Sequence, residues 1–385
     1  MNKELIYLDH AAATPVDRKV LAAMQPFLSD RFYNPSSPYA PAIEVRKVYD
    51  EAKKTIAKTF GASADDIVMT AGATESINLA FQSVTGHVVT SAIEHHSVLA
   101  AAKRHEHTLV GVDVKGVVDP QAVLGAIRDD TELVSIALAN NEIGTVQSLR
   151  AIADVVKTVR EKRLEEGNAT PIYLHTDASQ GVGQLDVHAS RLGVDLMTLN
   201  AAKIYGPKQV GLLWSAHHVT LQPLIHGGGQ ERGLRSGTEN VAGVVGFAKA
   251  MELATEHRAH ESDRLRTLRD AMQAKLLEAF PQSVISGHPK HRLASYLHIS
   301  FPSLDAERVL FSLENEGVLV ATGSACAANK GTRSHVLEAI GLEPSVADGS
   351  LRIALGHLSD ETSCNQAVDI IIETVRREYA RTGVA

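Results

Sequence analysis

Short apolar runs rich in β-branched residues alternate with amphipathic helical segments through the first half of the chain. The apolar runs lie at 67–70, 87–91, 108–114, 133–139 and 172–178. Segments with helical spacing of apolar residues begin at Ala73, Ser97 and Ser148. Strands that alternate with helices in this way form βα crossovers, which place the strands parallel in one sheet. The sequence therefore predicts an α/β fold with a mostly parallel sheet.

The pattern changes after two further predicted strands at 195–202 and 210–216. A long helical stretch follows from about 239 to 280, and the shorter strands and helices beyond it are typical of an α+β unit. A chain of 385 residues also exceeds the usual size of one compact core. We therefore expect two domains, a large one over 15–255 and a small one formed by 1–14 plus 256–385.

The composition excludes several classes of protein. Hydrophobic residues make up 44% and charged residues 22%, which is too apolar for a disordered chain. A formal charge of −7 lacks the basic surplus that nucleic-acid binding requires. The N-terminus does not fit a signal peptide, no apolar run is long enough to span a bilayer, and two cysteines form no disulfide framework. We expect a cytoplasmic protein that binds neither nucleic acid directly nor a membrane.

Two glycine-containing segments raise the question of a phosphate site. "MTAGATES" runs from a strand through a glycine into a helix, whose first turn at Ala73 and Thr74 offers free N–H groups to an anion. The same segment also fits an ordinary strand-to-helix turn, because it lacks the Walker lysine and the G-x-G-x-x-G series. "HGGGQERG" at 226–233 follows no suitable strand and opens no obvious helix, which disfavours a nicotinamide enzyme.

Asp177 and Lys203 end two other predicted strands, in "LHTDASQ" and "NAAKIYGP". Each residue alone is more often structural, since an acid commonly caps a helix and a lysine commonly lies in solvent. A desolvated lysine, however, forms Schiff bases, and a carboxylate keeps a pyridine nitrogen protonated. Lysine, aspartate and an anion-binding turn are the three groups that pyridoxal 5'-phosphate needs. The strand ends therefore predict a site for this cofactor.

Cys326 lies in "ATGSACAANKG", among small residues that provide hardly any apolar anchor. A cysteine in a core is usually flanked by residues that bury it and raise its pKa. Local composition alone leaves an idle loop cysteine and a reactive one equally open. Cys364 lies in a predicted C-terminal helical region, and we expect it to be structural.

With these motifs, the chain resembles the cysteine desulfurases, in the class V aminotransferase group of pyridoxal-phosphate enzymes with the fold-type I architecture. The resemblance covers nearly the whole chain and rests on "YLDHAAATP", "NPSS", "GATES", "IEHHSV", "NNEIGT", "TDASQ", "KIYGPK", "HGGGQERGLRSGT", "GSAC" and "LRIALG" in the family's order. The length of the segment after "GSAC" is similar to the IscS and NifS-like branch, whose cysteine loop is long and mobile. The resemblance implies that the small α+β domain carries this loop.

The resemblance also implies a role for each site residue. Lys203 would hold the cofactor as a Schiff base and later move the substrate's Cα proton, and His95 would stack on the ring and serve in acid–base steps. Together with Cys326, which would attack the substrate sulfur as a thiolate, they are the expected catalytic residues. The other expected cofactor contacts are Ala73 and Thr74 at the phosphate, Asp177 at the pyridine nitrogen, Gln180 at the ring hydroxyl, Asn200, and Thr238 at the phosphate of the neighbouring subunit. The expected substrate contacts are Asn34, Asn141 and Arg352, at the α-carboxylate.

The implied reaction converts L-cysteine to L-alanine and leaves the sulfur on Cys326 as a persulfide. The implied partners are a second copy of the chain, in a homodimer with composite sites, and a sulfur acceptor, either an iron–sulfur scaffold or a tRNA-thiolation enzyme. The persulfide loop would also be able to ligate a cluster, and no metal cofactor is expected. Two alternatives stay open: a selenocysteine or cysteine lyase without a persulfide relay, and a degenerate desulfurase kept as an assembly partner.

The sequence departs from the family's pattern beside the cofactor phosphate. The usual serine-x-histidine-lysine run is here Asn200, Ala201, Ala202 and Lys203, so a hydroxyl and an imidazole are missing. The side chain of Asn200 still offers an amide donor, whereas that of Ala202 offers none. The histidine often found after "NPSS" is also absent. We therefore expect weaker cofactor binding than the family pattern would provide.

Overall fold

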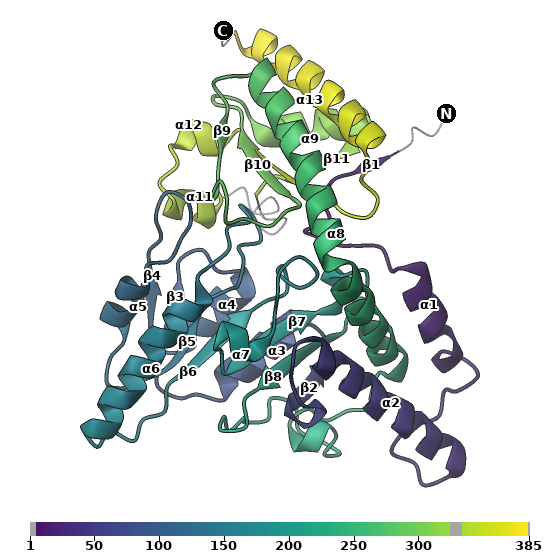
Figure 1. The fold of residues 1–385 in the computed structure, drawn as a ribbon. Coiled ribbons are helices and arrows are strands. Elements are labelled where there is room, and N and C mark those ends of the chain that lie inside the picture. Colours follow the sequence, from purple (N-terminus) through teal and green to yellow (C-terminus); the bar gives the residue numbers. More distant parts are fainter. Residues whose placement is uncertain (1–4, 324–332, 384–385) are drawn as a thin grey trace.

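The computed structural model describes residues 5–323 and 333–383, so Cys326 lies outside the described residues. Its described part contains a central sheet of seven strands in the order β2-β8-β7-β6-β5-β3-β4 (Figure 1). These strands are β2 (Ile67–Thr70), β3 (His87–Ser91), β4 (His107–Val110), β5 (Thr131–Ser135), β6 (Tyr173–Asp177), β7 (Leu196–Asn200) and β8 (Gly211–Ser215). All neighbouring pairs are parallel except those of β8, which is antiparallel to β2 and β7. The prediction of an α/β fold with a mostly parallel sheet is confirmed.

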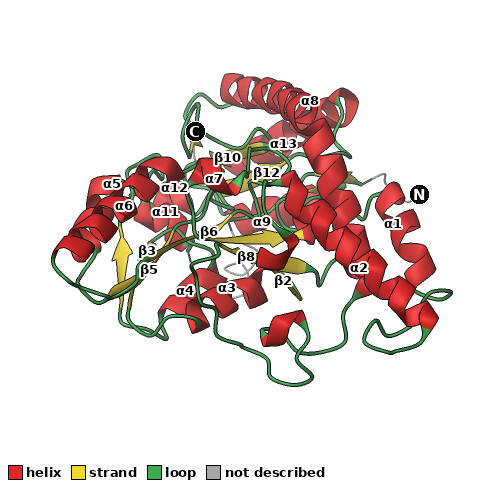
Figure 2. Ribbon diagram, turned by 60° about the horizontal axis from the view of Figure 1, so that its bottom comes forward, coloured by secondary structure: helices red, strands yellow, loops and turns green. Residues whose placement is uncertain are grey.

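Helices cover both faces of this sheet (Figure 2). They are α1 (Arg18–Met24), α2 (Ala40–Thr59), α3 (Ala73–Gln82), α4 (His96–Ala102), α5 (Pro120–Ala126), α6 (Leu149–Glu165), α7 (Ala189–Leu192) and α8 (Val241–Ala279). Residues from α2, α6 and α8 pack on one face of the sheet, and residues from α3 and α4 pack on the other. Successive residues of a strand point to opposite faces of the sheet. Leu212 belongs to the apolar cluster on the side of α2, α6 and α8, called the first cluster, and Leu213 belongs to the second cluster, on the side of α3 and α4.

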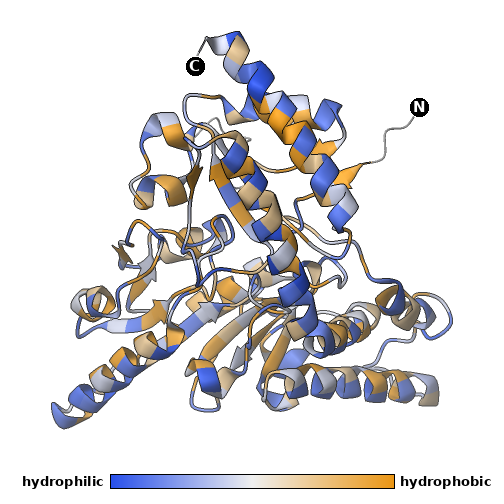
Figure 3. Cartoon of the chain, turned by 45° about the horizontal axis from the view of Figure 1, so that its top comes forward, coloured by the Kyte–Doolittle hydropathy of each residue, from blue (hydrophilic) through white to orange (hydrophobic). Residues whose placement is uncertain are grey.

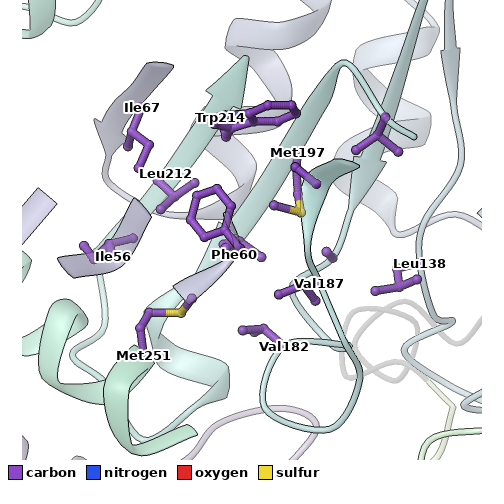
Figure 4. Packing of buried hydrophobic residues seen from close by; sticks show 14 of the residues in the cluster. Ile56, Phe60, Ile67, Leu138, Val182, Val187, Met197, Leu212, Trp214 and Met251 are labelled. Carbon is purple, nitrogen blue, oxygen red and sulfur yellow. The ribbon is translucent and has the colours of Figure 1, made fainter. Parts of the chain in front are cut away.

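The first cluster is the larger of these two apolar cores. Figure 4 shows Ile56, Met197 and Trp214 within it, where residues from α2, β7 and β8 meet. Figure 3 shows that the strands of the sheet are largely hydrophobic, while the outer helices carry mixed polar and apolar residues. Burial of both strand faces explains why the parallel strands read as continuous apolar runs in the sequence.

A smaller set of elements lies beyond the central sheet, at the upper end of the molecule in Figure 1. It contains an antiparallel sheet in the order β12-β10-β9 and a parallel pair, β1 with β11. The bounds are β1 (Ile6–Tyr7), β9 (Val284–Ile285), β10 (Tyr296–Ser300), β11 (Val318–Leu319), β12 (Ser350–Ala354), α9 (Ala306–Asn315), α11 (His335–Ala339), α12 (Pro344–Ala347) and α13 (Glu361–Thr382). Their apolar residues form a cluster of their own.

The long helix α8 joins these two parts of the molecule. Val244 and Met251 pack in the first cluster, whereas Leu265 and Leu276 pack in the cluster of the smaller part. The helix predicted for 239–280 is therefore confirmed, and it is continuous across the predicted boundary between 255 and 256. The domain bounds themselves stay a prediction. No described helix combines the length and the apolar character needed to cross a bilayer.

Several predicted ends were wrong. β4 ends at Val110 rather than at 114, and β5 ends at Ser135 rather than at 139. Helix α4 begins at His96, one residue earlier than expected, because the side chain of His95 accepts a hydrogen bond from the N–H of Ser97 and caps the helix. Ser148 occupies the N-cap position of α6 as expected, but its side chain makes no capping hydrogen bond.

Candidate functional site

A cavity of about 300 Å³ lies where the parallel strands of the central sheet end. Most of the residues predicted for the site line it, although they come from distant parts of the sequence. The predicted residues in its wall are Ala73, Thr74, His95, Asn141, Asp177, Gln180, Asn200, Lys203 and Arg352. Their contacts determine what this cavity could bind.

The first turn of α3 reaches the cavity through Ala73 and Thr74. Its N-cap, Gly72, has a φ of 134° and no side chain to satisfy the free N–H groups of the turn. Glu75, the acid in this turn, is engaged elsewhere: it accepts hydrogen bonds from the N–H of Ala71 and from Nε of Arg235, at 3.0 and 2.8 Å. The positive end of the helix dipole therefore remains available to an anion.

Lys203 ends the short 3₁₀ helix η3 (Ala201–Lys203), directly after β7. Its Nζ donates hydrogen bonds to the carbonyl oxygens of Ala11 and Ala12, both at 2.7 Å. Burial, with a smaller contribution from the positive charge of Arg352, lowers the pKa of Lys203 to about 8. About a tenth of this amine is then uncharged at pH 7, far more than for a lysine in water, and this form is a nucleophile and a base.

Asp177 ends β6, the parallel neighbour of β7, and is paired there with Thr198. Its Oδ1 accepts a hydrogen bond from the N–H of Ser179 at 3.0 Å. Gln180 lies three residues after Asp177. It donates through Nε2 to the carbonyl of Ala11 at 3.1 Å and accepts from the hydroxyl of Tyr296 at 2.7 Å. The ends of two adjacent strands therefore place a carboxylate and an amine in the same cavity.

His95 lines the cavity at the start of α4. Its Nδ1 accepts a hydrogen bond from the N–H of Ser97 at 3.1 Å, so the ring hydrogen of the neutral imidazole lies on Nε2. Surrounding protein lowers the pKa of His95 by desolvation, and the positive charge of Lys203 acts in the same direction. The next residue, His96, has its ring 4.8 Å from that of His335 and does not line the cavity.

Arg352 is almost completely buried in β12 and reaches the cavity from the smaller part of the molecule. Its Nη1 donates to the carbonyl of Asn141 at 3.0 Å, and its Nη2 donates to Oδ1 of Asp9 at 2.6 Å. Nε has no hydrogen-bond partner among the described residues. The guanidinium is therefore held in place with donor capacity to spare, which suits a carboxylate ligand.

Two predicted residues that the structure describes, Thr238 and Asn34, are not brought to this cavity. Thr238 is exposed and lines a different cavity, beside Tyr49 of α2. Asn34 is exposed, and its Oδ1 accepts a hydrogen bond from the N–H of Ser36 at 2.9 Å. Cys326 lies outside the described residues. The roles expected for these three residues stay predictions.

The chain was compared with known proteins. Residues 6–365 match the family described as aminotransferase class V. The chain belongs to this family. The protein named cysteine desulfurase IscS from Dictyoglomus turgidum is 40% identical over 389 residues, which cover 97% of this chain and 96% of that protein.

Solved structures of similar sequence also share this class V fold. One, named NifS-like protein, superimposes with a TM-score of 0.89 at 33% identity, over 97% of this chain and 100% of the other. A second, described as SspA in complex with cysteine, has a TM-score of 0.76 at 35% identity, over 91% of this chain and 98% of the other. The fold-type I architecture expected from the motifs is thus confirmed.

Sequence reasoning missed several groups in the wall of this class V cavity. Ser179 is buried, lines the cavity, and its hydroxyl has no hydrogen-bond partner in the described part of the chain. Its place between Asp177 and Gln180 in "TDASQ" was a usable signal. The carbonyls of Ala11 and Ala12 carried none, because any residue supplies a backbone oxygen. Cys364 is buried in α13, where burial raises the pKa of its thiol to about 11, as expected for a structural cysteine.

Proposed function

We propose that this protein is a cysteine desulfurase, which uses pyridoxal phosphate to convert L-cysteine to L-alanine and transfers the sulfur to Cys326 as a persulfide. One observation carries the proposal: a desolvated lysine and a carboxylate end adjacent parallel strands inside one cavity. The similar proteins support it, since one relative is named a cysteine desulfurase and one solved structure contains cysteine.

The polar groups of the cavity fit the proposed cofactor. The first turn of α3 offers N–H groups to a phosphate, Lys203 offers an amine to an aldehyde, and Asp177 offers a carboxylate to a pyridine nitrogen. The buried hydroxyl of Ser179 lacks a partner in the described structure, and a phosphate or ring oxygen would satisfy it. Asn200, at the end of β7, is the further donor expected beside the phosphate.

When bound, pyridoxal phosphate would act as an electron sink for a negative charge on the substrate's Cα. Arg352 would hold the substrate carboxylate through its planar donors, with Asn141 beside it. With a pKa lowered to about 8, the Lys203 amine would take the Cα proton at its Nζ and later return it. His95, whose neutral ring carries its hydrogen on Nε2, would donate a hydrogen bond from that atom, because its Nδ1 accepts from the N–H of Ser97.

Cys326 would complete the reaction, an assignment that rests on the motif "GSAC". Its thiolate would form a bond to the substrate sulfur while the bond between that sulfur and the substrate's Cβ breaks. Cβ would then gain a proton and become the methyl group of alanine. The products would be L-alanine and a persulfide. An external sulfur acceptor, either an iron–sulfur scaffold or a tRNA-thiolation enzyme, and a cytoplasmic location complete the proposal.

The functional protein would be a homodimer with composite sites. Thr238 supports this, because it is exposed and lies away from the cavity of its own chain. In a dimer, the same exposure would allow it to reach the phosphate site of the partner subunit. The partner would thus supply a group that the cavity of a single chain lacks.

An absorbance and product assay tests the proposed function. The protein mixed with pyridoxal phosphate should stay yellow after gel filtration has removed unbound cofactor, and it should release alanine from L-cysteine. Lys203→Ala should lose both properties, whereas Cys326→Ser should stay yellow and form no protein persulfide, because a hydroxyl is a poor nucleophile toward sulfur. Alanine release at the normal rate by Lys203→Ala, or labelled persulfide on Cys326→Ser, would refute the corresponding assignment.

A further inference from the structure

Four buried polar atoms of Arg352 and of two nearby side chains have no hydrogen-bond partner in the described part of the chain. Among the described residues, Oε1 of Glu142, both ring nitrogens of His298 and Nε of Arg352 lack a partner. The side chains of Glu142 and His298 are 1% and 0% exposed, and Oε1 lies 3.9 Å from Nε2 of His298. Unsatisfied buried polar atoms are costly and rare, so such a cluster calls for a physical explanation.

Strand pairing and a backbone carbonyl place this cluster next to Arg352. His298 in β10 lies opposite Arg352 in β12, where the two strands are paired. The carbonyl that accepts from Nη1 of Arg352 belongs to Asn141, the residue before Glu142. Burial raises the pKa of Glu142 and lowers that of His298, and the positive charge of Arg352 contributes in the downward direction at both, so both groups lie within electrostatic reach of Arg352.

The carboxyl of Glu142 is fixed by its surroundings. Its Oε2 accepts a hydrogen bond from the hydroxyl of Ser334 at 2.8 Å. The backbone N–H groups of Glu142 and Ile143 both donate to Oδ1 of Asn140 at 2.9 Å, which holds the turn in shape. The carboxyl of Glu142 is therefore held by Ser334 on a turn of fixed shape, and it cannot rotate away without breaking that hydrogen bond.

Glu142, and not the imidazole of His298, is the member of this cluster whose charge changes near neutral pH. Burial lowers the pKa of His298 to about 3, so its ring is neutral at all ordinary pH values. Burial raises the pKa of Glu142 to about 7, although Ser334 and Arg352 favour the charged form. Near neutral pH the carboxyl therefore exists in both forms.

We propose that Glu142 is a positioning residue for Arg352, and that its charge sets how strongly the guanidinium binds a carboxylate ligand in the cavity. The proposal rests on the proposed function, in which Arg352 holds the substrate carboxylate. A protonated Glu142 leaves the guanidinium charge to the ligand, whereas an ionised Glu142 competes for it. By linkage, a bound carboxylate must in turn favour the protonated form of Glu142.

Other charged and titratable groups also face Arg352, and they do not reproduce this effect. Asp9 accepts directly from Nη2 at 2.6 Å, and Tyr296 and Lys203 lie within electrostatic reach. Desolvation raises the pKa of Tyr296 beyond the physiological range, and Lys203 would be joined to the cofactor in the holoenzyme. Glu142 is then the group beside Arg352 whose pKa is shifted to near neutrality.

The test measures binding of propionate, a carboxylate without an amino group, to the pyridoxal-phosphate holoenzyme by calorimetry between about pH 6 and about pH 8.5. We expect the wild-type affinity to fall at least about fivefold over this range, the lower end of typical coupling between sites. Glu142→Gln keeps the shape and removes the charge, so its affinity should stay at the low-pH level throughout. Ser334→Ala removes a hydroxyl that favours the charged carboxylate, so the midpoint of the fall should move to higher pH.

Three outcomes are decisive. A fall in Glu142→Gln equal to that of the wild type overturns the inference. If Glu142→Gln does not fold, an unchanged midpoint in Ser334→Ala overturns it instead. Arg352→Gln separates the two proposals: it should lose propionate binding at every pH, and wild-type binding by this variant would contradict the carboxylate role of Arg352 itself.

Discussion

Lys203 illustrates how burial alone can change the chemistry of one side chain. A lysine in water has a pKa of about 10.4 and is almost entirely protonated at neutral pH. Burial in the cavity lowers the pKa of Lys203 to about 8, while two backbone carbonyls still hold the ammonium form by hydrogen bonds. The site therefore keeps the amine in a fixed place and makes it reactive near neutrality.

This shift predicts the pH dependence of cofactor uptake. The uncharged amine is the reactive form, and its fraction grows as pH rises through the pKa. The rate at which apoprotein forms its Schiff base with pyridoxal phosphate, followed by absorbance, should therefore rise with a midpoint near pH 8. Lys203→Ala is the control and should show no such phase. A midpoint above about pH 10, the value for an exposed lysine, would contradict the role of desolvation.

At the proposed phosphate site, Ala202 stands where the family's pattern has a histidine. Thr14 donates to the carbonyl of Ala202 at 3.0 Å, and the N–H of Ala202 donates to Oδ1 of Asn200 at 3.1 Å. The backbone there is thus well fixed, but the side chain contributes no donor. Hydrogen bonds to charged groups contribute about 1.5–3 kcal/mol, or about tenfold to a hundredfold in affinity.

Restoring the donor should strengthen cofactor binding. Ala202→His should lower the dissociation constant for pyridoxal phosphate by about tenfold or more, measured by equilibrium dialysis of apoprotein. The persulfide step should change little, because the phosphate takes no part in the bonds that form and break at the substrate. Equal or weaker affinity in the variant would show that Asn200 or another group already compensates for the missing imidazole.

At the scale of elements, Glu231 connects three segments that lie far apart in the sequence. It accepts hydrogen bonds from the hydroxyl of Tyr49 and Nζ of Lys53 in α2, and from the N–H of Met69 in β2, at 2.6, 2.9 and 2.9 Å. Glu231 and Arg232 have φ values of 48° and 59°, which are strained for residues with side chains. These bonds hold the strained turn at one end of the segment that leads to Thr238.

Removal of Glu231 should destabilise the fold severely. Glu231→Ala would leave the ammonium of Lys53, which is only 10% exposed, without its buried partner, and such changes cost about 3–5 kcal/mol. Glu44→Ala is the matched control, because the Glu44–Lys47 pair is 60% and 66% exposed and should contribute little to stability. Urea unfolding at one fixed protein concentration measures both; similar losses in the two variants would contradict this account.

At the scale of the whole molecule, the sequence predicted what depends on side-chain pattern. The parallel strands are buried on both faces, so each appears as an apolar run, and Asp177 and Lys203 could be located because they end such runs. Carbonyl groups such as those of Ala11 and Ala12 leave no pattern, since every residue has one. Glu142 was missed for a different reason: "NNEIGT" reads as a polar loop, yet the fold buries its acid completely.

The surface around α1 and α2 bears on how copies of the chain associate. Leu28, Phe32, Tyr39 and Ile43 are 62%, 69%, 50% and 45% exposed. Exposed apolar residues that gather in one region commonly mark a protein interface. The exposed Thr238 lies beside Tyr49 of α2, so this region and the residue proposed to act across subunits are neighbours. A two-fold dimer would exchange the same groups in both directions.

Co-expression of two defective variants tests this exchange. If Thr238 serves the partner's phosphate, a heterodimer of Lys203→Ala and Thr238→Ala carries both defects in one site and neither in the other. Random pairing makes half of the dimers mixed, so about a quarter of all sites should keep pyridoxal phosphate after dialysis. Each variant expressed alone should keep almost none, because one lacks the amine and the other a phosphate donor. If Thr238 acted within its own chain, every site of the mixture would be defective, and co-expression would retain no more cofactor than the separate variants.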